Sequence, residues 1–398
     1  MKKHLHIGLL PRIILSIVLG VLLGQVLSEP LVRIFVTFNA IFGQFLGFMI
    51  PLIIVGLVTP AIADIGRGAG KLLLVTVLIA YLDTVASGLL SYATGSWLFP
   101  AMVAGSSGVE TVTQPHNLSP YFTINIPPLL DVMAGLVFAF MMGLGISYGN
   151  HTTLHKCFSE FRDIIDKGIS TAIIPLLPLY IFGIFLHMTF TGEAFHIIVV
   201  FAQIIGVIFV LHVLVLVYQF LLAGLVVKKP PFRLLSTMLP AYLTALGTAS
   251  SAATIPVTLK QTLHNGVSEG IAGFVIPLCA TIHMSGSAMK ITACALTICL
   301  LTGQPHNPLL FLSFIMMLGI VMVAAPGVPG GAIMAALAPL GNILGFSADQ
   351  QALMIALYIA MDSFGTACNV TGDGAIALVV DRLFYRSNPI TEEVSINE

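Results

Sequence analysis

Long apolar runs, separated by short polar interruptions, extend along almost the whole chain. A membrane-spanning helix needs roughly 20 predominantly apolar residues, and eight stretches reach about that length. They lie near residues 7–27, 34–63, 71–99, 128–149, 168–190, 195–226, 268–301 and 349–385. The pattern therefore predicts an all-α integral membrane protein with about eight transmembrane helices.

Two further apolar segments are interrupted by small residues and prolines. Residues 243–259 include Ser250 and Ser251, and residues 324–341 include the run PGVPGG around Gly327. Each segment predicts two half-helices that meet at a tip. Non-helical backbone at membrane depth needs protein or a water-filled cavity to satisfy its polar groups, and paired broken helices are typical of the binding site of a secondary transporter.

Lysine and arginine predict the orientation, because cytoplasmic loops carry an excess of them. The basic residues before span one, between spans two and three, between four and five, and after six and eight share one side if both termini are cytoplasmic. We therefore expect a multi-pass protein of the plasma membrane, the inner membrane of a prokaryotic cell. The first stretch resembles a signal peptide, but a second apolar stretch follows so closely that we retain it as a span.

Composition supports the membrane assignment. Of the 398 residues, 57% are hydrophobic and 8% are charged, whereas soluble domains carry about 25% charged residues. The net charge of −1 provides no basic field, so the lipid bilayer is an expected partner and nucleic acid is not.

The last apolar stretch contains an unusually polar sequence, MDSFGTACNVTGD, at residues 361–373. Five of its residues are three or four positions apart and share one helix face: Asp362, Gly365, Thr366, Asn369 and Asp373. An aspartate at the bilayer centre costs about 2.5–3.5 kcal/mol and indicates a functional site. Two on one stripe predict a cationic partner, either a substrate or a coupling ion.

Four motifs in a fixed order carry a family resemblance. They are TASSAATIPVT, ATIHMSGSA, GVPGG and DSFGTACNVTGD. Over its C-terminal half the chain resembles the dicarboxylate/amino acid:cation symporters, the glutamate-transporter family. The resemblance implies a glutamate-transporter-like fold in which the two interrupted segments are re-entrant helical hairpins, and it implies a homotrimer.

The resemblance also implies a static scaffold and a transport domain that carries substrate across the membrane like an elevator. Residues 1–230 would be mainly scaffold and trimerisation helices, with spans three and six joining the transport domain, and 387–398 a cytoplasmic tail. The core transport domain would be 231–386, composed of a hairpin (231–262), a span (268–301), a hairpin (306–345) and a span (349–385).

Substrate-binding residues follow from the same resemblance. Asp362 would bind the amino group of an amino acid and Asn369 its carboxylate. The two hairpins would hold that carboxylate through Ser250, Ser251 and the backbone around Gly327 and Val328. Ser287 would contact the substrate side chain, with Gly365 and Thr366 on the same face of the last helix. The alternative for Asp362 is a structural ion pair.

Cation sites are implied as well. Asp373, with the carbonyl of Asn369, resembles a deep Na⁺ site, and backbone carbonyls near Cys279, Thr281 and Met284 resemble a second. Carboxylate and carbonyl oxygens suit a hard cation. The coupling ion would be Na⁺ or H⁺, and no other cofactor is expected.

Two departures from the family pattern change the expected chemistry. Members that carry acidic amino acids have an arginine where this chain has Gly365, and a bidentate arginine pair is hard to replace. We therefore expect a small neutral amino acid. His283 and Ser285 replace the family's asparagine and aspartate, so a third Na⁺ site should be absent. His283 would be a proton carrier or a hydrogen-bonded packing residue.

Lys290 is the most unusual charge, because it lies near the middle of the seventh span, seven residues after His283. One hypothesis is that its ammonium replaces a lost cation and neutralises Asp83 or Asp362. The alternative is that Lys290 extends into an aqueous vestibule.

Together these features predict a secondary active symporter that moves a small neutral amino acid, coupled to Na⁺ or H⁺. A dicarboxylate or acidic amino acid symporter of the same family is the alternative, and a substrate-independent ion channel is a weaker one. An enzyme is not expected, because no histidine lies at catalytic spacing to a nucleophile.

Overall fold

The computed structural model describes residues 9–65, 70–105, 118–130, 132–192, 194–323, 325 and 330–384. Within these residues the chain forms sixteen α-helices and one π-helical turn, and no strand. The predicted all-α class is confirmed.

Most of the predicted spans correspond to long apolar stretches. Five described stretches are long and apolar enough to cross a membrane, and a bent pair of helices adds a sixth. Three of the five lie in single helices, α2 (Glu29–Ile65), α3 (Gly70–Gly105) and α7 (Ala194–Val227), and the other two are Thr152–Phe190, which ends in α6 (Ile174–Phe190), and Glu269–Thr302. The helices at the first and fourth predicted spans, α1 (Leu9–Gly24) and α4 (Val132–Gly149), are shorter apolar helices. Their order along the chain follows the hydrophobic pattern.

The polar stretch between predicted spans four and five is a helix, not a loop. Helix α5 (Thr152–Gly168) continues through a π-helical turn, Ile169–Ile173, into α6. Its inner side carries Phe158, Phe161 and the buried Ile165, which packs against Gly56 of α2. Lys156, Glu160, Asp163 and Lys167 are exposed, so the segment is an amphipathic helix, although its charge content is similar to that of a loop.

The first interrupted segment forms the predicted hairpin. Helix α8 (Pro231–Thr237) leads into α9 (Leu239–Thr248), which packs against α10 (Ser251–His264). Ala249 turns the chain in a left-handed conformation with φ 49°, and the Ser250 Oγ accepts a hydrogen bond from the Ala253 N–H at 3.3 Å. Helices of 10 and 14 residues are too short to span a bilayer.

The second hairpin has the same construction. Helix α13 (Pro308–Val323) packs against α14 (Gly331–Asn342), and these helices contain 16 and 12 residues. Gly330 precedes α14 with φ 78°, in the left-handed region that favours glycine. The predicted substrate contacts at Gly327 and Val328 lie outside the described residues.

The last two spans are both broken helices. The chain leaves helical geometry between α11 (Glu269–Ile282) and α12 (Ser285–Thr302), where His283 is extended. A second break, at Met361, bends α15 (Ala348–Ala360) by 65° from α16 (Asp362–Phe384). Each break leaves backbone groups at a helix end without intrahelical partners, and the candidate site forms around these two breaks.

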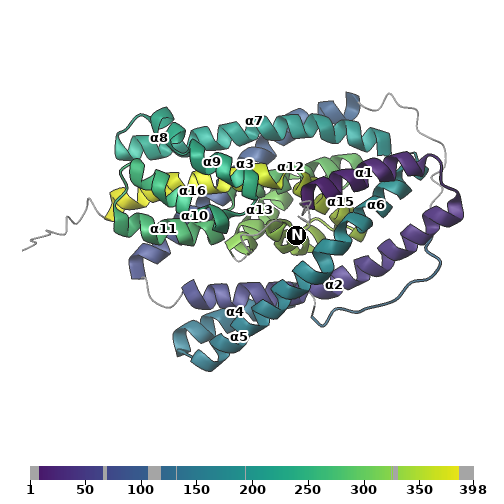
Figure 1. Ribbon diagram of the computed structural model, residues 1–398, viewed down its shortest axis with the longest axis horizontal. Helices are drawn as coiled ribbons and strands as arrows, with labels where there is room; N and C mark the ends of the chain where they lie inside the picture. Colours follow the sequence, from purple (N-terminus) through teal and green to yellow (C-terminus); the bar gives the residue numbers. More distant parts are fainter. Residues whose placement is uncertain are drawn as a thin grey trace, which may run out of the picture.

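Helix α16 is central to the C-terminal half. It packs against α7, α9, α10 and α11, while α12 packs against α3 and α7. Figure 1 shows α16 between α7 and α11, with α2, α4 and α5 grouped along the lower edge of the molecule. Every residue of α12 from Ser285 to Cys299 is buried, so protein surrounds this helix on all sides.

Candidate functional site

The polar stripe predicted in the last span lies on one helix and is buried. Asp362 is the first residue of α16, and Thr366, Asn369 and Asp373 follow at helical spacing. All four side chains belong to residues less than 9% exposed. The stripe therefore faces neighbouring helices along about three turns.

Asn369 binds the start of α12. Its Oδ1 accepts hydrogen bonds from the N–H groups of Gly286 (2.9 Å) and Ser287 (3.4 Å), and its Nδ2 donates to the Ser287 Oγ at 3.2 Å. The amide thus satisfies backbone donors that the break before α12 leaves open. Two predicted substrate residues, Asn369 and Ser287, are brought together in this way.

Asp362 contacts the second hairpin. Its Oδ2 accepts a hydrogen bond of 2.7 Å from the N–H of Gly330, immediately before α14. One turn before Asp362, the Tyr358 hydroxyl lies 2.8 Å from the Ser287 Oγ. Tyr358 was missed by the sequence analysis, although its position four residues before Asp362 could have indicated it.

Lys290 enters this group from α12. Its Nζ donates a hydrogen bond of 2.9 Å to the Met361 carbonyl and lies 4.1 Å from the centre of the Tyr358 ring. The residue is 1% exposed, which excludes an extension into an aqueous vestibule in this conformation. A Cβ atom on Gly365 would collide with the Nζ and Cε of Lys290. The ammonium therefore lies in the space that any larger residue at position 365 would need.

Asp373 belongs to a second buried cluster, centred on His283. The His283 Nδ1 is 2.8 Å from the Asp373 Oδ1, and its Nε2 is 2.7 Å from the Asp83 Oδ2. An ionised carboxylate only accepts hydrogen bonds, and a neutral imidazole has one donor nitrogen. With two ionised carboxylates and a neutral imidazole, only one of the two contacts can be a hydrogen bond. Both are hydrogen bonds if the three side chains hold one more proton, on the second ring nitrogen or on a carboxyl group.

Asp83 is held by α7 as well as by His283. Its Oδ1 accepts from the Tyr218 hydroxyl at 2.7 Å, and its Oδ2 accepts from the Gln219 Nε2 at 2.6 Å. The Gln219 Nε2 also donates to the Ser285 Oγ at 3.0 Å. Asp83 was one of the two expected partners of Lys290, but the Lys290 ammonium makes its hydrogen bond elsewhere, to the Met361 carbonyl. The sequence signal that could have identified Tyr218 and Gln219 is their polarity within an otherwise apolar span.

One oxygen of the second cluster stays open. The Asp373 Oδ2 is buried and has no hydrogen-bond partner among the described residues. A buried carboxylate oxygen without a donor is costly, and a hard cation would satisfy it. The donor set at Asp373 therefore fits the predicted cation there.

The second predicted cation site is less complete. The Cys279 carbonyl accepts the N–H of His283, and the Met284 carbonyl accepts the N–H of Ala288, both at 2.9 Å. The Thr281 side chain is exposed, and its hydroxyl donates to the Leu278 carbonyl. Each of the two carbonyls accepts one hydrogen bond and retains a lone pair, whereas the Thr281 hydroxyl is directed to its own helix.

The first hairpin lies along α16. Ser250 caps α10, Ser251 is buried, and both α9 and α10 pack against α16. The two serines are therefore on the hairpin that packs against α16, and their contact with a substrate stays a prediction.

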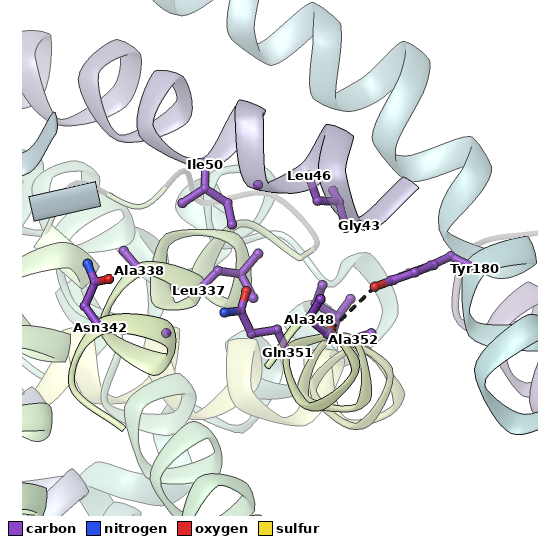
Figure 2. Close-up of a pocket in the computed structure, with 13 residues that line it drawn as sticks. Gly43, Leu46, Ile50, Tyr180, Leu337, Ala338, Asn342, Ala348, Gln351 and Ala352 are labelled. Atoms are coloured by element: carbon purple, nitrogen blue, oxygen red, sulfur yellow. Dashed lines mark hydrogen bonds between the residues drawn. The ribbon is translucent and has the colours of Figure 1, made fainter. Parts of the chain in front are cut away.

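A separate pocket lies between α2, α6 and the pair α14 and α15 (Figure 2). Tyr180 reaches it from α6, and its hydroxyl lies 3.5 Å from the Ala348 carbonyl. Apart from Asn342 and Gln351 the wall is mostly apolar or glycine. None of the predicted site residues lines this pocket, so it is distinct from the candidate site.

Comparison with known proteins shows the family of the chain. The family model described as "Sodium:dicarboxylate symporter family" matches residues 9–383. The chain is 26% identical over 365 residues to the Serine/threonine transporter SstT of Acinetobacter baylyi, covering 87% of this chain and 90% of that protein. It is 30% identical over 261 residues to Excitatory amino acid transporter 1 of Homo sapiens, covering 63% of this chain.

The chain spans about half the length of the excitatory amino acid transporters it matches, 47% for the human and rat proteins. The family model, in contrast, extends across nearly all the described helices, from α1 to α16. The chain is a multi-pass membrane protein and belongs to the sodium:dicarboxylate symporter family.

Proposed function

We propose that this protein is a secondary active symporter for a small neutral amino acid, coupled to a cation and operating by an elevator mechanism. The observation that carries the proposal is the buried contact between Asp362 on α16 and the Gly330 N–H of the second hairpin. A carboxylate at membrane depth that is covered by a hairpin tip is suited to a substrate that enters when the tip moves away.

Asp362 is the proposed ligand of the substrate amino group. Asn369 and Ser287 lie next to each other and supply hydroxyl and amide groups for the carboxylate or a side-chain hydroxyl. Ser250, Ser251 and the backbone at Gly327 and Val328 complete the proposed set from the hairpins. A small substrate is favoured because the end of Lys290 fills the space beside Gly365.

A second candidate substrate has its own support. A neutral substrate was expected because glycine at position 365 cannot pair with a second substrate carboxylate. The Lys290 ammonium, however, lies beside Gly365 and could form that pair. An acidic amino acid or a dicarboxylate would find a cationic partner there. Substrate competition therefore decides between the two classes.

Na⁺ is the proposed coupling ion, with its site at the open Asp373 Oδ2. H⁺ is the second candidate, because the contacts among Asp83, His283 and Asp373 require a shared proton. A homotrimer of scaffold domains, with the described C-terminal helices moving as the transport domain, completes the proposal. The packing of α3 and α7 on α12 and α16 supports assigning those two spans to the moving part.

Uptake into proteoliposomes tests the proposal. Purified protein is reconstituted, and radiolabelled L-serine uptake is measured with an inward Na⁺ gradient or an inward H⁺ gradient imposed separately. We expect serine accumulation that one gradient drives, with unlabelled alanine competing more strongly than aspartate or succinate. Stronger competition by aspartate or succinate would favour the second substrate class. Current without substrate, or no gradient-driven accumulation of any of these compounds, would contradict symport.

A further inference from the structure

We infer that Lys290 is a built-in cation of the transport domain and that it replaces one coupling ion, so that fewer cations accompany each substrate. The inference rests on the proposed function, since it concerns the ions that accompany transport. It does not depend on which amino acid is carried.

The position of the ammonium is that of a bound cation. Carbonyls at the C-terminal end of a broken helix coordinate Na⁺ in transporters of this construction, and the partial negative charge of a helix C-terminus attracts cations. The Met361 carbonyl lies at such an end, directly after α15, and it accepts its hydrogen bond from the Lys290 Nζ. The Tyr358 ring face, 4.1 Å away, adds a cation–π contact.

The ammonium is fixed in this place. Protein surrounds α12, and Lys290 lies near the middle of its buried segment, so its side chain has no route to the surface. Gly365 leaves the space that the Nζ and Cε occupy. Lysine and glycine on two different helices therefore fit each other.

The buried charges near α12 and α16 determine how many cations the transport domain must bind. The described residues around α16 and α12 place Asp362 with Lys290 at one break, and Asp83 and Asp373 with His283 at the other. Buried carboxylates without a countercharge are strongly disfavoured in the membrane. A transport domain that lacks the Lys290 charge would carry one more net negative charge and would need one more bound cation to cross.

The test compares wild-type protein with Lys290→Met, which removes the charge and retains an apolar chain. The number of charges moved per L-serine is obtained from the membrane potential that stops net serine flux in proteoliposomes. We expect the ratio to rise by about one elementary charge in the variant, and the Na⁺ or H⁺ dependence to become steeper. Lys260→Met, an exposed lysine on α10, is the matched control and should keep the wild-type ratio. An unchanged ratio in Lys290→Met overturns the inference.

A second measurement applies if Lys290→Met carries no serine. Thermal unfolding of the purified protein is followed in NaCl and in choline chloride, at pH values from 5 to 8. We expect Na⁺, or acid if the coupling ion is H⁺, to raise the unfolding temperature more in Lys290→Met than in the wild type. Equal shifts in the two proteins overturn the inference. Absence of serine transport by the wild type itself would instead count against the proposed substrate.

Discussion

Asp362 and Asp373, two of the three aspartates of α16, show two different ways to keep a carboxylate inside a membrane protein. Asp362 accepts a backbone N–H from a hairpin and has the Lys290 ammonium in its neighbourhood without a direct ion pair. Asp373 contacts the His283 ring directly, and that ring contacts a second carboxylate, Asp83. Asp362 therefore contacts a hairpin, which in the proposed function moves away to admit substrate, whereas the Asp373 oxygen that faces His283 contacts a side chain between α11 and α12.

The hydrogen-bond partners support this contrast. Asp83 receives hydrogen bonds from two residues of α7 as well as from His283, so the Asp373 cluster connects three long elements. The contact of Asp362 with the second hairpin is made by the N–H of Gly330, beside the hairpin tip. A cluster that connects several helices should govern stability, and one closed by a hairpin should govern substrate binding.

The largest expected effect is on stability, from His283→Asn. The change leaves two buried carboxylates facing each other without the bridging ring, and breaking a buried pair costs about 3–5 kcal/mol. We expect a large fall in the unfolding temperature of the purified protein, measured in detergent. His264→Asn, an exposed histidine on α10, serves as the control. If both variants unfold at the wild-type temperature, the cluster of Asp83, His283 and Asp373 does not stabilise the fold.

Asp362→Asn should weaken substrate binding more than it lowers the stability of the fold. The amide is similar in size to the carboxylate but loses the charge that pairs with a substrate ammonium group, and a hydrogen bond to a charged group contributes about 1.5–3 kcal/mol. We expect serine affinity to fall by about 10- to 100-fold, with a smaller fall in the unfolding temperature than His283→Asn causes, since the buried Lys290 ammonium loses only a nearby charge and not a direct ion pair. Undiminished serine or alanine uptake would remove the amino-group assignment.

Gly365→Ala tests the close approach between α16 and Lys290. The new Cβ collides with the Nζ and Cε of Lys290, and such overpacking costs about 1–3 kcal/mol. In a Lys290→Leu background the cost should nearly vanish, because only the Lys290 Cδ position remains near the new atom, at 3.5 Å. The measurement is a double-mutant cycle of unfolding free energies. Additive effects would show that the lysine is not held in this space.

The smallest effects are expected at Tyr358. Tyr358→Phe removes the hydroxyl contact with Ser287 but keeps the ring below the ammonium, and one hydrogen bond contributes about 1 kcal/mol. Tyr358→Leu removes the ring as well and should lose a further 1–2 kcal/mol, roughly, of cation–π stabilisation. Unfolding free energies of the two variants, measured in the wild-type and Lys290→Met backgrounds, separate the contribution of the hydroxyl from that of the cation–π contact. The difference between Phe and Leu should shrink in the Lys290→Met background.

Much of the fold could be predicted from hydrophobic length alone. The apolar runs indicated the spans, and the prolines and small residues indicated both hairpins, because those features are local in the chain. The burial of Asp362, Asn369 and Asp373 on a single helix was likewise visible in their spacing. The family resemblance rests on the same local motifs, which the family model matches across residues 9–383.

The charge partners could be predicted only in part, because they depend on the two helix breaks. Asp362 was one of the two expected partners of Lys290, whereas the contacts of His283 with Asp83 and Asp373 were not expected. His283 and Lys290 are seven residues apart, which on a continuous helix would place them on one face. The break before Ser285 separates them, so that His283 meets Asp83 while Lys290 reaches the Met361 carbonyl at the other break. A single sequence does not contain the relative positions of the helices that meet at these breaks.

The fit between Gly365 and Lys290 also has a consequence for sequence variation. Lys290 and a long side chain at position 365 would need the same volume, so a substitution at either position should depend on the residue at the other. Among relatives that keep this helix geometry, a lysine at the position of Lys290 should occur with a small residue at the position of Gly365.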